Sequence, residues 1–353
     1  MQTGILREKD RQILNLIVES YLKKAKPISS GYVAQRSLLS VSSATVRNIM
    51  SKLEEYGFLS QPHTSAGRVP TDKGLRHYVN NLFDKAIIPE QKIELLSENL
   101  ILHKGDFHSF LHQVSKILAD YSDNLGFVLS PRISKINFQH VRFIKVSEFK
   151  IMSILITPSN FVLTKIVQTK TYFTQAELDK ASQYINQSFR SKNLHFIRDY
   201  LLHELPKYKI KYESIIDKLI TLLKAYISYE ERENEIFFQG TPKLLEKHDL
   251  FNMEKLKSLF QNFEEKAKLA KLLSDFISLD RVKVMIGSEL DIPDISDCSL
   301  FLSHYGDHSQ ILGSLGIIGP KRIQYKKIIP LVDCIAKSLS QTISFLFYVM
   351  REL

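Results

Sequence analysis

The sequence predicts a multidomain α+β protein with a helical N-terminal part. Its 353 residues exceed what one compact domain usually holds, so two or three domains are expected. Hydrophobic residues make up 44% of the chain and charged residues 24%, which is ordinary for a globular protein and argues against wholesale disorder. The apolar spacing changes from helical periodicity to strands between residues 125 and 170, and strands return after residue 282.

The N-terminal part predicts three closely spaced helices. In the first, Ile13, Ile17 and Tyr21 recur every four residues, and Pro27 ends the pattern. Serines stand where N-caps are needed before the second and third helices, and Gly57 is a natural end for the third. The predicted helices span residues 8–25, 29–37 and 42–57, with a short turn at 38–41.

The third helix carries residue types that suit a DNA major groove. Its core-facing stripe is Val46, Ile49, Met50 and Leu53, which leaves Ala44, Thr45, Arg47, Asn48, Ser51 and Lys52 mostly outward. Arg47 can reach guanine and Asn48 can pair with adenine, each through two hydrogen bonds. Thr45 and Lys52 are expected to hold phosphates. The small residues Ser42, Ser43 and Ala44 let the helix start approach a phosphate closely.

A basic hairpin is predicted directly after this helix. Residues 58–61 and 68–70 form its two short strands, and Pro62 and Gly67 set the loop. The residues expected to contact phosphate or enter a minor groove are His63, Thr64, Ser65, Gly67 and Arg68. An ordinary amphipathic helix or a polar turn explains either part alone. The third helix, its preceding turn and the hairpin together predict a winged helix-turn-helix.

Charge is concentrated in the same region. Residues 1–80 carry 12 basic and 6 acidic side chains, a net charge of 12 − 6 = +6. This is more than half of the formal net charge of +10 for the whole chain. A local basic excess favours a polyanionic partner, because neutralised phosphates release counterions. A solvated basic surface remains an equally good interpretation of the charge alone.

The remainder predicts two strand-rich blocks separated by a helical insertion. A proline-containing joint at 87–89 is the best candidate for a linker, and Thr71 can cap a helix before it. The expected helices are 90–121, 174–189, a largely helical stretch at 193–275, and a final helix from about Tyr325. The expected strands are 127–129, 141–144, 151–156, 161–167, 282–286, 299–303 and 316–318. The apolar faces of 210–228 and 251–276 suit either a partner subunit or intramolecular burial.

Catalytic, metal and cofactor sites are not expected. Cys298 and Cys334 form no CxxC pair and are expected to be buried thiols. His304, Asp307 and His308 suggest a loop rather than a metal or catalytic cluster. The glycines at 313, 316 and 319 lack dinucleotide-binding spacing and are expected in turns and strand packing. With no signal peptide and no long apolar run, a cytoplasmic protein without a membrane span is expected.

Several strings resemble the heat-inducible transcription repressor family HrcA. The longest are SSATVRN at 42–48 and LEEYGFLSQPHTSAGRVPTDKG at 53–74. Shorter ones, which fall in the family's order, are FQGT at 238–241, DCS at 297–299, LGIIGP at 315–320 and IPLVD at 329–333. One departure is Ile49, where many members carry an acidic residue; its spacing favours packing with Val46 and Leu53.

The resemblance implies a bacterial repressor of chaperone genes. Members bind an inverted-repeat operator in double-stranded DNA as homodimers, and chaperonin keeps them active. The fold implied is a winged helix, then a GAF-like α/β domain interrupted by a mainly helical inserted domain. The expected divisions are 1–82 for DNA binding, 83–192 for a linker helix and the first GAF-like part, 193–278 for the inserted dimerisation domain, and 279–353 for the second GAF-like part.

Two other functions stay open on the residues alone. A small effector could bind the GAF-like domain and gate DNA binding, although the sequence offers no clear pocket chemistry. An enzyme tethered to a DNA-binding domain would need a nucleophile, a metal cluster or a phosphate loop, and no convincing one is found.

Overall fold

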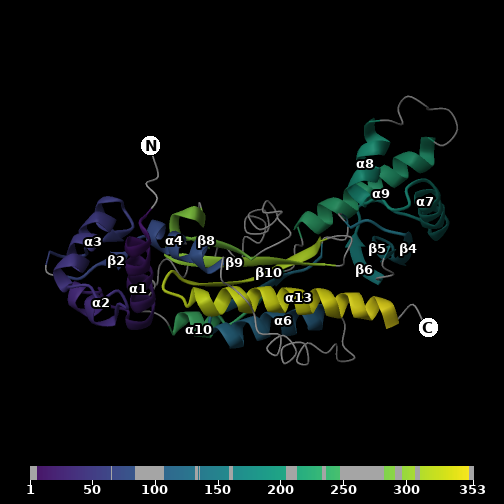
Figure 1. The fold of residues 1–353 in the computed structure, drawn as a ribbon. Coiled ribbons are helices and arrows are strands. Elements are labelled where there is room, and N and C mark those ends of the chain that lie inside the picture. Colours follow the sequence, from purple (N-terminus) through teal and green to yellow (C-terminus); the bar gives the residue numbers. More distant parts are fainter. Residues whose placement is uncertain are drawn as a thin grey trace.

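The protein was studied as a computed structural model of the whole chain. The structure describes residues 6–64, 66–83, 107–131, 134, 136–158, 162–203, 213–232, 236–246, 282–290, 296–306 and 311–349. Within them the fold is mixed α+β, with a helical N-terminal unit followed by β-sheet units (Figure 1). The expected joint at 87–89 and the expected helix before residue 107 lie outside the described residues.

The N-terminal unit has the predicted order of elements. It comprises α1 (Glu8–Lys24), α2 (Ser30–Arg36), α3 (Ser43–Glu55), β1 (Leu59–Ser60), β2 (Val69–Pro70) and α4 (Asp72–Phe83). Ile13, Ile17 and Leu53 are fully buried, because the apolar stripes of α1 and α3 pack on each other. Ser29 and Ser42 cap α2 and α3 as expected, and the Thr71 hydroxyl accepts the Gly74 N–H at the start of α4.

The centre of the molecule is a five-stranded antiparallel sheet. Its strands lie in the order β7-β3-β10-β9-β8. They are β7 (Ile236–Gln239), β3 (Leu125–Leu129), β10 (Ile311–Pro320), β9 (Cys298–Gly306) and β8 (Lys283–Ile286). The short η4 turn (Gly287–Leu290) follows β8. Because β3 and most of β9 and β10 are buried, this sheet supplies much of the core.

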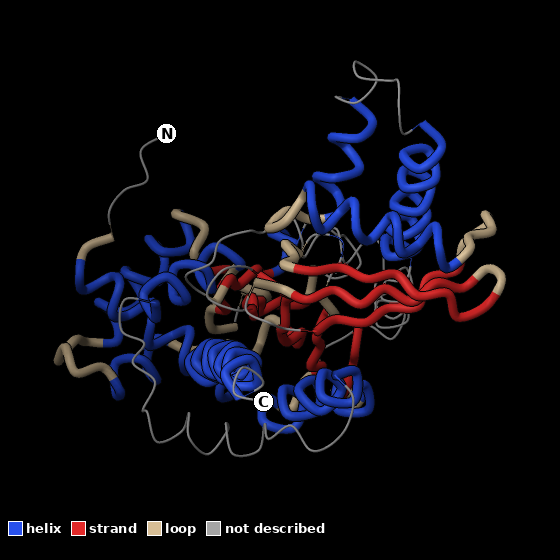
Figure 2. Tube along the Cα trace, turned by 90° about the vertical axis from the view of Figure 1, so that its right-hand side faces the viewer, coloured by secondary structure: helices blue, strands red, loops and turns tan. Residues whose placement is uncertain are grey.

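Two long helices lie along this sheet. They are α6 (Phe107–Ser122), which packs on β3, and α13 (Tyr325–Val349), which packs on β9 and on α6 (Figures 1 and 2). The short α10 (Thr241–Leu245) lies near β3. Cys298 and Cys334 are buried and form no disulfide, as expected. In the described part of the chain, no helix is both long and apolar enough to span a bilayer.

A second sheet stands at the far end from the N-terminal unit (Figure 1). Its antiparallel strands are β4 (His140–Ser147), β5 (Lys150–Ile156) and β6 (Val162–Gln168), in that order. The accompanying helices are α7 (Gln175–Ser188), α8 (Leu194–His203) and α9 (Glu213–Arg232). The α9 residues Leu219, Leu222 and Tyr226 are buried, and Tyr226 accepts a hydrogen bond from Ser153 at 3.0 Å. The described apolar face of this helix therefore packs within the chain.

The strand pairing differs from the predicted division of the chain. The four strands between 125 and 170 were all expected in the GAF-like part, but only β3 pairs with β10 of the later block. In addition β7, which lies inside the expected helical insertion at 193–278, pairs with β3. The chain thus leaves the central sheet after β3 and returns at β7, so the three strands β4–β6 accompany the inserted helices. Periodicity identified the strands other than β7, which falls in a stretch expected to be largely helical, and it could not choose their partners.

The other candidate clusters are part of the central sheet. His304 lies within β9 rather than in a loop, and its Nδ1 is 2.9 Å from the Ser314 hydroxyl. Asp307 and His308 lie outside the described residues. The glycines at 313, 316 and 319 lie on β10, which confirms their role in strand packing. Among the residues that the structure describes, no group of acidic, histidine or cysteine side chains could hold a metal ion.

We predict that Gly316→Ala destabilises the central sheet. A Cβ at this position would stand 2.0 Å from the Phe301 carbonyl oxygen and 2.6 Å from the Phe127 ring. Overpacking of this kind lowers the free energy of unfolding by about 1–3 kcal/mol. The matched control is Gly31→Ala in α2, where the nearest atom is 4.0 Å away. Urea unfolding of both variants measures the effect, and equal stability of the two would contradict it.

Candidate nucleic-acid interface

Helix α3 presents a polar face to solvent. Val46, Ile49, Met50 and Leu53 are buried, as the stripe predicts, and Ile49 does pack with Val46 and Leu53. Ala44, Arg47, Asn48 and Ser51 are exposed. Within the described residues, the side chains of Arg47 and Asn48 have no hydrogen bond or ion pair. Both side chains are therefore available to an incoming partner.

The start of α3 is held by serine hydroxyls. The Ser42 hydroxyl accepts the Thr45 N–H at 3.1 Å and lies 2.9 Å from the Thr45 hydroxyl. The Ser43 hydroxyl lies 3.2 Å from that of Ser30 at the start of α2. Ser42, Ser43 and Thr45 thus shape the helix end in this structure, while Ala44 offers the close approach that its small size predicts.

Lys52 is engaged inside the protein. Its ammonium group donates to the Asp10 carboxylate of α1 at 2.7 Å, and the Asp10 side chain is only 8% exposed. A buried carboxylate needs a cation or hydrogen-bond donors, because it has lost its water. In this structure Lys52 neutralises Asp10 and joins α3 to α1, and its contact with phosphate stays a prediction.

The hairpin is fixed to the helices by its last residues. The backbones of Arg68 and Ile28 exchange two hydrogen bonds of 2.9 Å. A Cβ on Gly67 would stand 2.4 Å from the Ile28 carbonyl oxygen, so only glycine allows this approach. The Arg68 guanidinium, 17% exposed, pairs with Glu54 of α3 at 2.8 Å. Gly67 and Arg68 therefore have structural roles in this unit, and their contact with phosphate stays a prediction.

The tip of the hairpin remains open to solvent. The Gln61 side-chain amide donates to the carbonyls of Thr64 and Ala66, which closes the turn. His63 and Thr64 are exposed, as a DNA-contacting tip requires. Ser65 lies outside the described residues.

Two exposed features of this surface were not expected. Leu38, in the turn between α2 and α3, is fully exposed, which suits contact with a thymine methyl group or a sugar. Lys24 stands 3.6 Å from the centroid of the Tyr32 ring and Arg36 stands 5.0 Å from it. The sequence signals were an apolar residue inside a helix-turn-helix turn and basic residues flanking an aromatic one.

The last helix of the unit contacts the central sheet through charged residues. The Asp72 carboxylate accepts the Ser288 N–H at 3.1 Å and the Lys321 ammonium at 2.9 Å. Arg76 pairs with Glu289 through two nitrogens and donates to the Val284 carbonyl oxygen at 2.6 Å. These five residues with Val284 form what we term the α4 contact, and they set how the unit sits on the sheet.

One histidine in α4 adds no charge to the surface. Burial lowers the pKa of His77 below its usual value, and the nearby Arg11 lowers this pKa further. The ring packs edge-on against Phe58 beside β1. The imidazole is therefore mainly neutral at pH 7 and contributes packing.

We predict that Lys52→Met lowers the free energy of unfolding by about 1–3 kcal/mol, because Asp10 is left buried without its partner. The double variant Asp10→Asn/Lys52→Met should recover most of the loss, and Lys9→Met, an exposed lysine of α1, should have little effect. Chemical denaturation checks the stabilities. If Lys52 were a phosphate contact instead, its loss would lower the salt slope of DNA binding by about one without unfolding the unit.

Comparison with known proteins assigns the chain to a family. A family model described as "HrcA protein C terminal domain" matches residues 108–329. The heat-inducible transcription repressor HrcA of Thermodesulfovibrio yellowstonii is 33% identical over 98% of this chain and 100% of its own length. The repressor of the same name from Geobacter sulfurreducens is 34% identical, covering 95% of this chain and 98% of its own. A crystal structure of a hypothetical protein shares the fold, with a TM-score of 0.62 and 23% identity over 97% of this chain and 99% of that one. The chain therefore belongs to the HrcA family of heat-inducible transcription repressors, which are regulators and not enzymes.

Proposed function

We propose that the N-terminal unit, residues 1–82, is a winged helix-turn-helix that reads an inverted-repeat operator in double-stranded DNA. The observation that carries this proposal is the free polar face of α3, where Arg47 and Asn48 are exposed without partners among the described residues. A helix of 13 residues at about 1.5 Å per residue spans roughly 20 Å, long enough to lie in a major groove. Arg47 and Asn48 read bases, while Thr45, His63 and Thr64 border the phosphates.

We predict that Arg47→Ala weakens operator binding by about 1–3 kcal/mol and relaxes the base preference at one position of each half-site. Binding to random DNA should fall far less, because the lost contact is to a base edge. The control is Arg190→Ala, an exposed arginine outside the N-terminal unit. Fluorescence anisotropy on both DNAs checks this. Equal losses on operator and random sequence would rule out a base-reading role.

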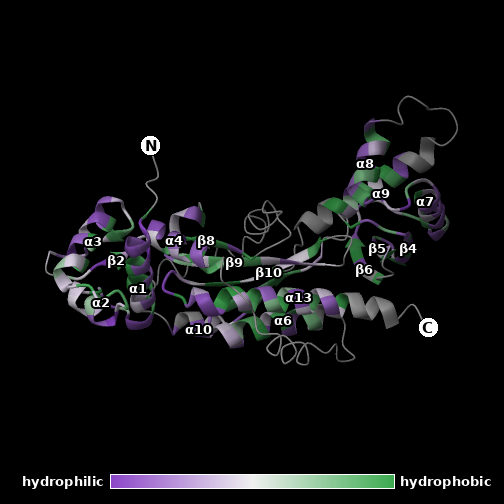
Figure 3. Cartoon of the chain, viewed as in Figure 1, coloured by the Kyte–Doolittle hydropathy of each residue, from purple (hydrophilic) through white to green (hydrophobic). Residues whose placement is uncertain are grey.

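We further propose that the chain acts as a homodimer, since an inverted repeat requires two DNA-binding domains related by a two-fold axis. The support is the open face of the β4–β5–β6 sheet. On this face Met152 is aligned with Ile144 and Ile166, and Ile156 with Val162. Val162 and Ile166 are 44% and 49% exposed, and hydrophobic colour extends along β6 in Figure 3. Neighbouring exposed apolar side chains on a sheet face are typical of a protein interface.

Ile166→Lys should therefore shift the chain to monomers, because it places a charge on the exposed part of that face, on the edge strand β6. The affinity of this variant for the operator should also fall, since a monomer has one DNA-binding domain and contacts only one half-site. Gln183→Lys, an exposed α7 position on the other side of the sheet, should leave the dimer intact. Analytical ultracentrifugation measures the assembly. A stable Ile166→Lys dimer would place the interface elsewhere, for example in the region that the sequence predicted at 193–278.

The remaining parts of the proposal come from the family resemblance. The regulated genes are chaperone operons, the protein works in the cytoplasm, and heat removes the repressor from DNA while chaperonin restores it. The central sheet corresponds to the GAF-like domain in this proposal.

Operator binding should accordingly disappear on heating as the chain unfolds or aggregates, and chaperonin with nucleotide should restore it after cooling. Parallel anisotropy and light-scattering measurements during a temperature cycle check this. Operator affinity that survives heating unchanged would contradict heat sensing by the repressor itself.

A further inference from the structure

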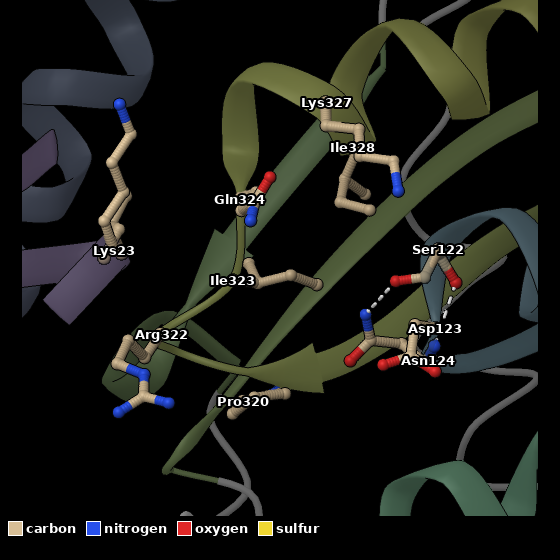
Figure 4. Close-up of a pocket in the computed structure, with 11 residues that line it drawn as sticks. Lys23, Ser122, Asp123, Asn124, Pro320, Arg322, Ile323, Gln324, Lys327 and Ile328 are labelled. Atoms are coloured by element: carbon tan, nitrogen blue, oxygen red, sulfur yellow. Dashed lines mark hydrogen bonds between the residues drawn. The ribbon is translucent and has the colours of Figure 1, made fainter. Parts of the chain in front are cut away.

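A basic cleft separates the N-terminal unit from the central sheet (Figure 4). Its volume is about 450 Å³. One wall is the end of α1, with Leu22 and Lys23. The other walls are residues 122–124, Pro320, residues 322–324, Lys327 and Ile328. The cleft therefore has walls from both units, and its volume lies within the range of small-molecule sites.

The charged side chains around the cleft are mainly cations. Lys23, Arg322 and Lys327 line it, opposed by the carboxylate of Asp123. Within the described residues, the side chains of these three cations have no ion pair or hydrogen bond. Their neighbours behave differently, because Lys321 pairs with Asp72 and Lys326 lies 3.8 Å from Glu19. In residues 321–327, two lysines thus have acidic partners within the chain, while Arg322 and Lys327 line the cleft.

The floor of the cleft is apolar and well fixed. Ile323 and Ile328, which are 5% and 1% exposed, line the cleft together with Pro320. Asn124 is buried and donates to the Ser122 carbonyl oxygen at 2.6 Å. A Cβ on Gly319 would stand 2.5 Å from the Asn124 side-chain oxygen, so the floor is closely packed at this point. The cleft thus combines cations that have no partner among the described residues with a closely packed floor that has a small apolar part.

We propose that this cleft binds a small organic polyanion of the nucleoside di- or triphosphate class. Arg322, Lys327 and Lys23 supply charge-assisted hydrogen bonds to phosphate oxygens, and the apolar floor packs against the organic part. The volume suits a molecule of that size better than a single inorganic ion.

Occupation of the cleft would couple to DNA binding. A ligand that touches both α1 and the start of α13 stabilises the orientation in which the N-terminal unit and the central sheet form the cleft together. Arg322 directly follows Lys321, which holds Asp72 in the α4 contact. By linkage, a ligand that fixes the N-terminal unit in its operator-binding orientation is itself bound more tightly in the presence of operator.

The test is calorimetric titration of the full-length chain without DNA at about 0.15 M salt, where exposed charges are largely screened. The probes are ATP, GTP, inorganic triphosphate and adenosine. The variants are Arg322→Gln/Lys327→Gln, which removes two cleft cations, and Asp123→Asn, which removes the opposing carboxylate. Lys180→Gln on α7 is a control for surface charge, and Arg47→Ala controls for binding to the α3 face.

We expect a nucleoside triphosphate to bind at one site per chain. The double variant should weaken it at least about tenfold, as the loss of two charge-assisted hydrogen bonds requires. Asp123→Asn should tighten it, and both controls should leave it unchanged. Weaker binding of inorganic triphosphate and of adenosine would support use of both the cations and the apolar floor.

Three outcomes would overturn the proposal. The first is no binding of any nucleotide. The second is equal binding of nucleotide and inorganic triphosphate, which would make the cleft a simple anion site. The third is a loss in Arg47→Ala as large as that in the double variant, which would place the nucleotide on the DNA-binding face. Melting temperatures of all variants with and without ligand separate lost binding from lost folding.

Discussion

The burial of one side of α3 is the constraint on which the rest of this structure depends. Val46, Ile49, Met50 and Leu53 leave the helix only one orientation on α1 and α2, and that orientation turns Arg47 and Asn48 outward. Each buried aliphatic side chain contributes about 1.5–3 kcal/mol to this choice of face. A helix rotated by one residue would bury the Arg47 charge without a partner. The free energy needed to bury that charge exceeds the stabilisation that the apolar contacts could provide.

Ion pairs and close backbone contacts then fix the parts around that helix. Asp10 with Lys52 sets α1 against α3, and Glu54 with Arg68 sets the hairpin against α3. The approach of Gly67 to Ile28 fixes where the hairpin leaves the helices. The α4 contact carries the orientation of the whole unit to the central sheet. Under the proposed function, two operator half-sites demand a defined distance and angle between the two DNA-binding units, so these polar contacts would matter for function as well as for folding.

The sequence predicted local features well and non-local ones poorly. Helix and strand periodicity, capping serines and the buried stripe of α3 are visible within a few turns of chain, and the structure bears them out except at β7, which was expected to be helical. The partners of Lys52 and Arg68 lie 42 and 14 residues away along the chain, so these ion pairs could not be predicted from the sequence. The pairing of β3 with β7 joins strands about a hundred residues apart, across a second sheet, and no periodic pattern encodes that choice. The exposed positions of Arg47 and Asn48 were predictable because they follow from the stripe alone.

The most direct test of the account is a salt-dependent titration of the full-length chain. It compares an inverted-repeat operator from upstream of a chaperonin operon with scrambled DNA of equal length. The account predicts operator binding tighter by about a thousandfold or more, since the exposed side chains of α3 read base edges. Equal affinities with the same steep salt slope, persisting when chaperonin is added, would show a non-specific basic surface and contradict the account.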